Sequence, residues 1–380
     1  MKQYDDLRKR GKLAEAMRPA KQALYLARRS FPKRSAEVAQ ALDNLGSLYS
    51  DLNRHNPARP LLEEAVAIRA NIFGVDHPKY LSSLESLAYV HMRKGLHEKA
   101  RKLFNMILAH RKAKSGPNSL QVARTMVYLG ELAMRTGKRL QAERLLKSGL
   151  DMLGNTSDAA EECQADLWAR LGDLYRIKGD YDRAEILLAR SINLQSEITG
   201  ENHFDVALTL GRLALVHWHQ GKKAQSKAEL FRAQEIVAES CGLNSIRYAE
   251  ELVLTGLVCH KEGKYWRAKV LFEMAKPILE TIQPDDQKAL VLVHYFLGVA
   301  YCNLHEWMAA EQALVRSLVI AEKLPRSQPS DMAPSLKALV QLYHLTGQPQ
   351  RARRYQNQLE RLRSINGASD ADAPAKRTPE

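Results

Sequence analysis

A 42-residue period runs through the whole sequence and limits what the chain can fold into. One position, usually Gly or Ala, returns at each step, at Gly46, Ala88, Gly130, Gly172, Ala214, Gly256, Gly298 and Val340. One period before Gly46 lies Tyr4, so an incomplete ninth unit opens the sequence. A fixed period of this length is typical of a solenoid of helical hairpins, which grows along one axis and needs no single globular core.

The spacing of apolar residues within a period predicts two helices that pack closely. In the fifth repeat, Trp168, Leu171 and Tyr175 are three and four residues apart and share one helix face. Gly172 lets a second helix approach this face, and Gly179 suits the turn that follows. The same pattern recurs in the second, third, fourth and eighth repeats. We therefore expect an all-α fold.

The pattern resembles the tetratricopeptide repeat in its 42-residue, kinesin-light-chain form. The phrases 74–78 (GVDHP) and 200–203 (GENH) are similar to the linkers of that subfamily, whereas Asn53 and His305 replace the usual turn glycine. The resemblance covers residues 1–365 and implies a right-handed superhelical α-solenoid of about nine helix-turn-helix repeats. Asn tolerates a positive φ, so Asn53 is compatible with the turn.

The two ends differ from the middle. Arginines and Gln356 make the last helix, Pro349–Ile365, polar, as a terminal capping repeat requires. Residues 366–380 lack apolar periodicity and are expected to form a disordered tail. The first unit lacks most of its first helix. Its edge would be covered by sequence missing from this chain, by a partner or by a second copy, and the last makes a homo-oligomer an open alternative.

Composition argues against a membrane protein. The longest apolar stretch, 289–302, is too short to span a bilayer and contains His294. The first ten residues lack the apolar core of a signal peptide, and the four cysteines show no CxxC spacing, so we expect a cytoplasmic protein. A secretion signal upstream of Met1 would instead make the protein periplasmic or secreted.

Positive charge is concentrated in two segments. Residues 1–40 carry 11 Lys or Arg against 4 Asp or Glu, and residues 93–114 carry 8 against 1. One interpretation is a set of solvated helix faces. The alternative is contact with nucleic acid or another polyanion through Arg8–Lys12, Arg28–Arg34 and Lys99–Lys114.

The resemblance implies that the first helix of each pair lines a concave groove that holds ligands. The polar candidates for partner binding there are Tyr89, Arg93, Arg124, Tyr128, Arg135, Arg170, Arg176 and Arg212. Carboxylates share these helices, so the groove is expected to be mixed in sign. The arginines either form ion pairs between repeats or bind carboxylates of a peptide.

Further along the chain, the groove positions become apolar. The candidates for partner binding there are Leu215, Trp218, Leu254, Leu257, Tyr295, Phe296 and Val299. Either the superhelix or a second copy covers this strip, or it anchors a helix or extended segment of a partner.

No catalytic motif, phosphate loop or metal-ligand pattern is present, so we expect no enzyme, no cofactor and no metal site. His217 and His219 are two residues apart on a helix and point in different directions. The leading hypothesis is a protein-interaction scaffold that binds a partner peptide or helix in its groove. Polyanion binding and self-assembly through the first unit are the alternatives.

Overall fold

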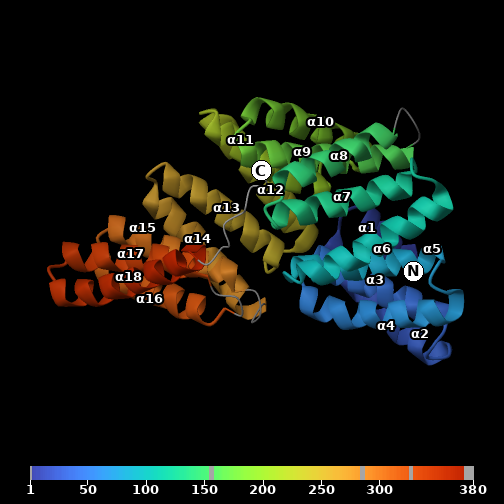
Figure 1. Ribbon diagram of the computed structural model, residues 1–380, viewed down its shortest axis with the longest axis horizontal. Helices are drawn as coiled ribbons and strands as arrows, with labels where there is room; N and C mark the ends of the chain where they lie inside the picture. The colour runs from blue at the N-terminus through green and yellow to red at the C-terminus, as the bar shows by residue number, and fades with distance from the viewer. Residues whose placement is uncertain (1, 154–157, 283–286, 325–327, 372–380) are drawn as a thin grey trace, which may run out of the picture. The chain divides into compact units, whose positions relative to one another are not determined.

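The structure is a computed structural model that describes residues 2–153, 158–282, 287–324 and 328–371. Within these ranges it is all-α, with eighteen helices in nine pairs that pack on one another in chain order (Figure 1). The first twelve are α1 (Lys2–Lys9), α2 (Leu13–Ser30), α3 (Ala36–Asp51), α4 (His55–Phe73), α5 (Pro78–Arg93), α6 (His97–Ser115), α7 (Leu120–Arg135), α8 (Arg139–Leu153), α9 (Asp158–Lys178), α10 (Tyr181–Thr199), α11 (Phe204–His219) and α12 (Lys223–Cys241). The remaining six are α13 (Ile246–Lys261), α14 (Tyr265–Ile282), α15 (Lys288–Asn303), α16 (Trp307–Glu322), α17 (Pro329–Leu345) and α18 (Pro349–Ala371).

The chain divides into two compact units, and the boundary in the sequence falls within the residues of α13. Unit 1 comprises residues 1–251 and unit 2 comprises residues 252–380. The candidate functional site lies in unit 1. In unit 2, α16, α17 and α18 share a core that includes Leu314, Leu339 and Tyr343.

The periodic small residue lets the two helices of a pair approach closely. A Cβ atom added to Gly46 of α3 would lie 2.8 Å from Cγ of Leu62 in α4, a distance that real Cβ atoms do not show. The same conflict arises at Gly298 of α15, where Leu314 of α16 would lie 2.5 Å away. Each of these glycines therefore makes room for the buried leucine sixteen residues later.

Turns and caps end the helices where the sequence predicts. The backbone takes the left-handed φ of 60° at Asn53 and 61° at His305, the two positions where the turn glycine is replaced. In the linkers, Nδ1 of His77 accepts a hydrogen bond from the backbone N–H of Lys79, and Nδ1 of His203 accepts one from that of Asp205. These histidines cap α5 and α11.

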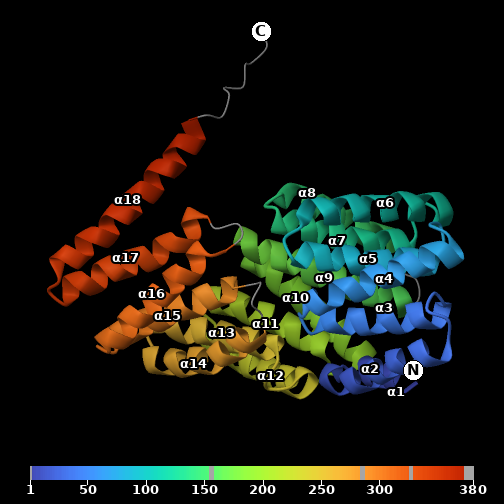
Figure 2. The same cartoon turned by 90° about the horizontal axis from the view of Figure 1, so that it is seen from below.

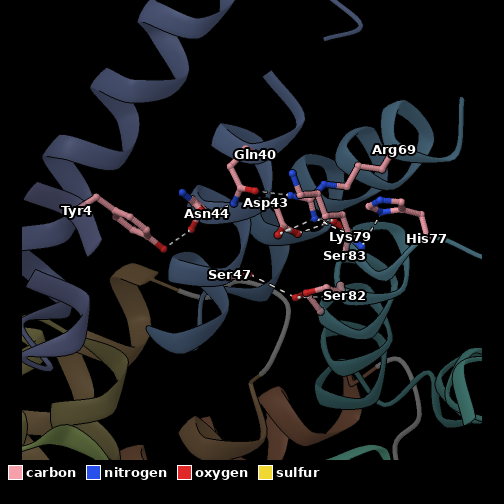
Figure 3. Close-up of polar contacts among 11 residues, drawn as sticks. Tyr4, Gln40, Asp43, Asn44, Ser47, Arg69, His77, Lys79, Ser82 and Ser83 are labelled. Atoms are coloured by element: carbon pink, nitrogen blue, oxygen red, sulfur yellow. Dashed lines mark hydrogen bonds and ion pairs between the residues drawn. The ribbon is translucent and has the colours of Figure 1, made fainter. Parts of the chain in front are cut away.

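A buried charged triplet joins the second repeat to the third. Arg69 of α4, only 2% exposed, forms an ion pair with Asp43 of α3 at 3.2 Å and donates to Oγ of Ser83 in α5 at 2.6 Å (Figure 3). Ser83 donates to Oδ1 of Asp43 at 2.8 Å, and Arg69 also donates to the Lys79 carbonyl oxygen and to Oε1 of Gln40. One guanidinium thus connects three helices.

The same three positions carry a related triplet one period later. Arg111 pairs with Glu85 at 2.5 Å and donates to Oγ1 of Thr125 at 2.8 Å. After one more period the positions hold three buried apolar residues, Val127, Leu153 and Leu167. One period further, Thr209 donates to Oε1 of the buried Gln195 at 3.0 Å. The boundaries between these repeats therefore hold paired polar groups or an apolar set, because a lone buried charge is costly.

At the end of unit 1 these positions hold Gly211, Val237 and Glu251. Glu251 is 4% exposed, and a Cβ atom at Gly211 would touch its carboxylate. Burial and the neighbouring Glu250 raise the pKa of Glu251 to about 8, although Arg247 and Arg212 act in the opposite direction. Glu251 is therefore largely protonated in the folded protein at neutral pH.

The last helix is polar on its exposed side. Arg351, Arg353 and Arg354 of α18 are exposed, whereas Ala352 and Leu359 are buried against the preceding pair. The helix runs to Ala371 and so enters the segment predicted as a tail. Residues 372–380 of that segment lie outside the described residues.

Replacing Arg69 alone tests the charged triplet. We expect Arg69→Leu to lower the free energy of unfolding by about 3–5 kcal/mol, because it leaves the Asp43 carboxylate buried without its cation. The triple variant Asp43→Val, Arg69→Leu, Ser83→Leu copies the apolar set that the chain uses two repeats later, and should recover most of this loss. Urea unfolding followed by circular dichroism measures both. Equal stability of the single variant and the wild type would contradict the prediction.

The protonated Glu251 predicts an unusual dependence of stability on pH. The folded state binds more protons than the unfolded state between about pH 4.5 and 8, so stability falls as pH rises through this window. Glu251→Gln should remove this slope and be more stable than the wild type at pH 8, by up to about 4 kcal/mol. Urea unfolding at pH 5, 6.5 and 8 measures the effect, with Glu239→Gln, an exposed carboxylate of α12, as the control. Parallel pH profiles for the wild type and Glu251→Gln would disprove it.

Candidate functional site

Unit 1 closes on itself, because its first helices contact its last ones. Helix α2 packs beside α12 (Figure 2), and Gly11, in the turn before α2, lies against His203 and Phe204 at the start of α11. Arg247 of α13 donates through Nε to the carbonyl oxygen of Asp51 at 3.0 Å. Residues about 200 positions apart in sequence therefore meet, and unit 1 forms a ring.

The inner side of the ring holds a cavity of about 1140 Å³ that is partly open to solvent. Its wall is built by the inner helices α1, α3, α5, α7, α9 and α11, with contributions from α10 and the first turn of α13. A cavity of this size is slightly larger than the usual small-molecule site of about 300–1,000 Å³. It is large enough to hold several residues of a peptide.

The wall of the cavity carries both signs of charge. Its seven carboxylates belong to Asp5, Asp43, Asp51, Glu85, Glu162, Asp166 and Asp205. Its five cations belong to Arg8, Lys9, Arg124, Arg170 and Arg247. The wall is thus slightly acidic in a chain whose formal net charge is +14.

One side of the ring holds a cluster of arginines around a buried glutamate. Glu131 of α7, 3% exposed, pairs with Arg170 of α9 at 3.1 Å and with Arg135 at 3.0 Å. Burial alone would raise the pKa of Glu131, but Arg170, Arg135 and Arg93 lower it to about 2. This pairing fixes the guanidinium of Arg170 at the cavity wall.

Asp166 of α9 faces the cavity and forms no hydrogen bond or ion pair within the described part of the chain. Desolvation by the surrounding wall, together with Asp205 and Glu162, raises the pKa of Asp166 to about 6, although Arg170 acts against this. A carboxylate in this state is available to accept hydrogen bonds from a ligand or to pair with a cation.

Aromatic rings form another part of the wall. Tyr89 of α5 meets Tyr128 of α7 edge to face, with ring centroids 5.9 Å apart. Behind them, the buried Phe104 stacks on Tyr128 at 5.4 Å. The tyrosines therefore present a fixed, partly apolar surface beside the charged groups.

Four of the eight polar candidates line this cavity: Tyr89, Arg124, Tyr128 and Arg170. The other four are not part of its wall. Arg93 donates to the turn residue Asn53, Arg135 pairs with Glu131, and Arg176 pairs with Asp173 at 2.7 Å. Arg212 of α11 is half-buried, and burial, with Arg170 nearby, lowers its pKa. Arg135 and Arg176 thus form ion pairs within their own helices, whereas Arg170 with Glu131 and Arg124 with Glu162 form ion pairs between repeats.

The seven apolar candidates are all half-buried. Leu215 and Trp218 lie on α11 in unit 1, whereas Leu254, Leu257, Tyr295, Phe296 and Val299 lie in unit 2. Phe296 stacks on the buried Phe272 and also contacts the rings of His260 and Tyr295. Packing within unit 2 therefore accounts for part of this strip, and its role in binding stays a prediction.

Several residues of the wall were not found from the sequence. Arg8 of α1, Phe204 and Asp205 of α11 and Arg247 of α13 reach the cavity only because the ring closes. The 42-residue step gives a partial signal, since Ser82, Arg124, Asp166 and Leu208 follow one another at this interval and all line the wall. Closure itself leaves no local pattern in the sequence.

The chemistry of the described residues offers little support for catalysis. Cys163 lines the cavity, but burial raises the pKa of its thiol to about 12, so the reactive thiolate is scarce. No group of three or more metal-ligating side chains is found in the described ranges, and His217 lies between Glu185 and Glu229. None of the helices described is long and apolar enough to cross a membrane.

Comparison with known proteins identifies the repeats. Family models of the tetratricopeptide repeat match residues 38–79, 79–155 and 163–230. The chain is a tetratricopeptide repeat protein. The prediction from the 42-residue period is thereby confirmed, and proteins of this repeat class are generally interaction scaffolds.

Two curated relatives and one solved structure illustrate the range of this similarity. The chain is 27% identical over 230 residues to the secreted RxLR effector protein RXLR-C07 of Plasmopara halstedii, covering 60% of this chain and 70% of that protein. It is 22% identical over 306 residues to Protein KINESIN LIGHT CHAIN-RELATED 1 of Arabidopsis thaliana, covering 80% of this chain but spanning only half the length of that relative. The structure of Rap protein complexed with competence and sporulation factor has a TM-score of 0.59 at 11% identity, covers 96% of both chains and shows a shared fold.

The glutamate at the centre of the arginine cluster should stabilise unit 1. Because the pKa of Glu131 is lowered, its contribution is complete above about pH 4.5 and is lost as pH falls towards 2. Glu131→Gln should therefore cost about 3 kcal/mol at pH 7, and the difference from the wild type should shrink below about pH 4.5 and close near pH 2. Urea unfolding at pH 7 and pH 3 measures it. A loss that is the same at both pH values would argue against the ion pairs as its cause.

Proposed function

We propose that this tetratricopeptide repeat protein is a scaffold that holds a segment of a partner protein in the cavity of unit 1. The observation that carries the proposal is the open cavity of about 1140 Å³, whose wall combines charged groups of both signs with two tyrosines. Peptides offer backbone donors and acceptors along their whole length, and such a wall can satisfy them. The absence of a nucleophile paired with a base among the described lining residues favours binding over catalysis.

The charges of the wall favour particular partner groups. Among the described residues, Arg124 forms an ion pair with the exposed Glu162 at 3.3 Å, and a partner carboxylate can replace this weak contact. Asp166 can accept an amide, a hydroxyl or a cationic side chain. We therefore infer a polar partner segment that carries both signs of charge. The apolar candidates of α11 and unit 2 remain a second proposed contact.

Polyanion binding is the second candidate function, and the exposure of basic residues on the outer helices favours it. On α2 and the turn after it, Arg18, Lys21, Arg29, Lys33 and Arg34 are all exposed. Tyr25, Leu26 and Phe31 are exposed beside them, at 58%, 51% and 44%. Binding through this surface would weaken steeply as the salt concentration rises.

Self-assembly through the first unit receives less support. Leu13, Ala16 and Ala20 of α2 are buried within one copy of the chain, and α2 already contacts α12. The edge that prompted this hypothesis is therefore largely covered inside unit 1.

Filling the cavity separates the two functions. Ser82 is exposed on the cavity wall, and the equivalent position one period later holds the large side chain of Arg124. We expect Ser82→Trp to fold and to reduce capture of a protein partner at least tenfold in a nuclease-treated pull-down at high salt. Gln141→Trp, on the outer helix α8, is the matched control and should bind as the wild type does.

Each result of this pull-down has one meaning. Retention at high salt that Ser82→Trp abolishes supports the cavity as the binding site. Unchanged capture by Ser82→Trp overturns the cavity proposal. Capture that is lost at high salt or after nuclease treatment in both variants favours binding of a polyanion.

A further inference from the structure

In the turn after α3, Asn53 replaces the glycine that most of the equivalent turns contain. The positions one or more periods away hold Gly11, Gly95, Gly137, Gly179, Gly221, Gly263 and Gly347, with His305 as a second exception. All have a positive φ, which glycine adopts readily and other residues resist. Asn53 therefore accepts a backbone conformation that glycine would adopt more easily.

The side chain of Asn53 makes contacts that glycine cannot make. Nδ2 of Asn53 donates to Oε1 of Glu250 at 2.7 Å, although the two residues are 197 positions apart in sequence. Oδ1 of Asn53 accepts from Nη2 of Arg93 at 3.0 Å and lies 2.6 Å from Nε2 of His55. Asn53 itself is only 7% exposed. The amide thus connects its own repeat, the next repeat and the start of α13.

A second contact lies beside the first. Arg247 donates through Nε to the Asp51 carbonyl oxygen at 3.0 Å, and its guanidinium lies 5.4 Å from the centre of the Phe204 ring. Asp51 and Phe204 both line the cavity. We define the clasp as the contacts of Asp51 and Asn53 with Arg247 and Glu250, which join the two ends of the ring.

By contrast, the side chain of His305 occupies the equivalent turn in unit 2 and contacts a neighbour in sequence. His305 has the same φ, 61° against 60°, and its ring meets the neighbouring Trp307 edge to face at 5.1 Å. That contact is local, between residues two apart in sequence. Replacement of the turn glycine and closure of the ring are therefore separable features, and only Asn53 combines them.

We propose that Asn53 is a positioning residue that holds the ring of unit 1 closed, and that the clasp opens to admit the partner segment and closes behind it. The gating role rests on the proposed function, whereas closure by Asn53 does not. The closure consists of the clasp, a short contact of α2 with α12 and the contact of Gly11 with His203 and Phe204. At the other boundaries of unit 1, helices pack along their lengths. Opening at the closure therefore breaks fewer interactions than separation at another boundary between repeats.

Asn53→Gly tests the clasp without straining the turn. Glycine is the residue that most equivalent turns use, and it adopts their positive φ readily, so the variant should fold. Spin labels placed as unnatural amino acids at Gln22 of α2 and Glu239 of α12, both exposed, report the distance across the closure. We expect this distance distribution to become longer and broader in Asn53→Gly.

His305→Gly is the matched control, because it makes the same replacement at the same φ in unit 2. It should leave the distance distribution unchanged. Glu250→Ala removes the acceptor of the same hydrogen bond and should broaden the distribution as Asn53→Gly does, with no further change in the double variant. An unaltered distribution in Asn53→Gly overturns the clasp.

The gating role has its own readout. Release of the partner captured through the cavity should be at least tenfold faster from Asn53→Gly than from the wild type, and unchanged from His305→Gly. A broadened distance distribution with unchanged release overturns gating but leaves closure by Asn53 standing. Failure of the proposed function is a different result, since it appears as unchanged capture by Ser82→Trp.

Discussion

The close approach of the two helices in each pair is the constraint on which the structure depends. Gly46, Gly130 and Gly298 leave no room for a Cβ atom because a leucine sixteen residues later occupies that space. A single hairpin cannot bury its remaining apolar face, so each pair must stack on the next one. The 42-residue period keeps these contacts in register and brings the inner helices of unit 1 to one wall.

Polar groups buried between the repeats of unit 1 include two complete charged triplets. The triplets around Arg69 and Arg111 are complete, and the equivalent set two repeats after Arg69 is wholly apolar. At the equivalent positions around Glu251, Gly211 and Val237 carry no charge. Burial raises the pKa of Glu251 to about 8, so this acid is largely neutral in the folded protein.

Closure of the ring and the pairing of charged residues determine which charged groups face the cavity. Glu131 holds Arg170 at the wall, while Asp166 faces the same space with no such partner among the described residues. The wall is therefore slightly acidic although the chain is basic, and the excess positive charge lies on outer surfaces such as that of α2. This separation lets one protein present two different surfaces, a mixed cavity inside and a basic face outside.

The sequence by itself determined the repeat, the helix pairs, the turn residues and the mixed sign of the inner helices, because each follows from side chains at fixed short intervals. It also predicted that Tyr89, Arg124, Tyr128 and Arg170 lie on the inner helices, because equivalent positions recur every 42 residues. Only the tertiary structure brought Asp51 and Asn53 against Arg247 and Glu250. That contact depends on the accumulated curvature of several repeats. Small differences in packing determine this curvature, and no local sequence pattern encodes it.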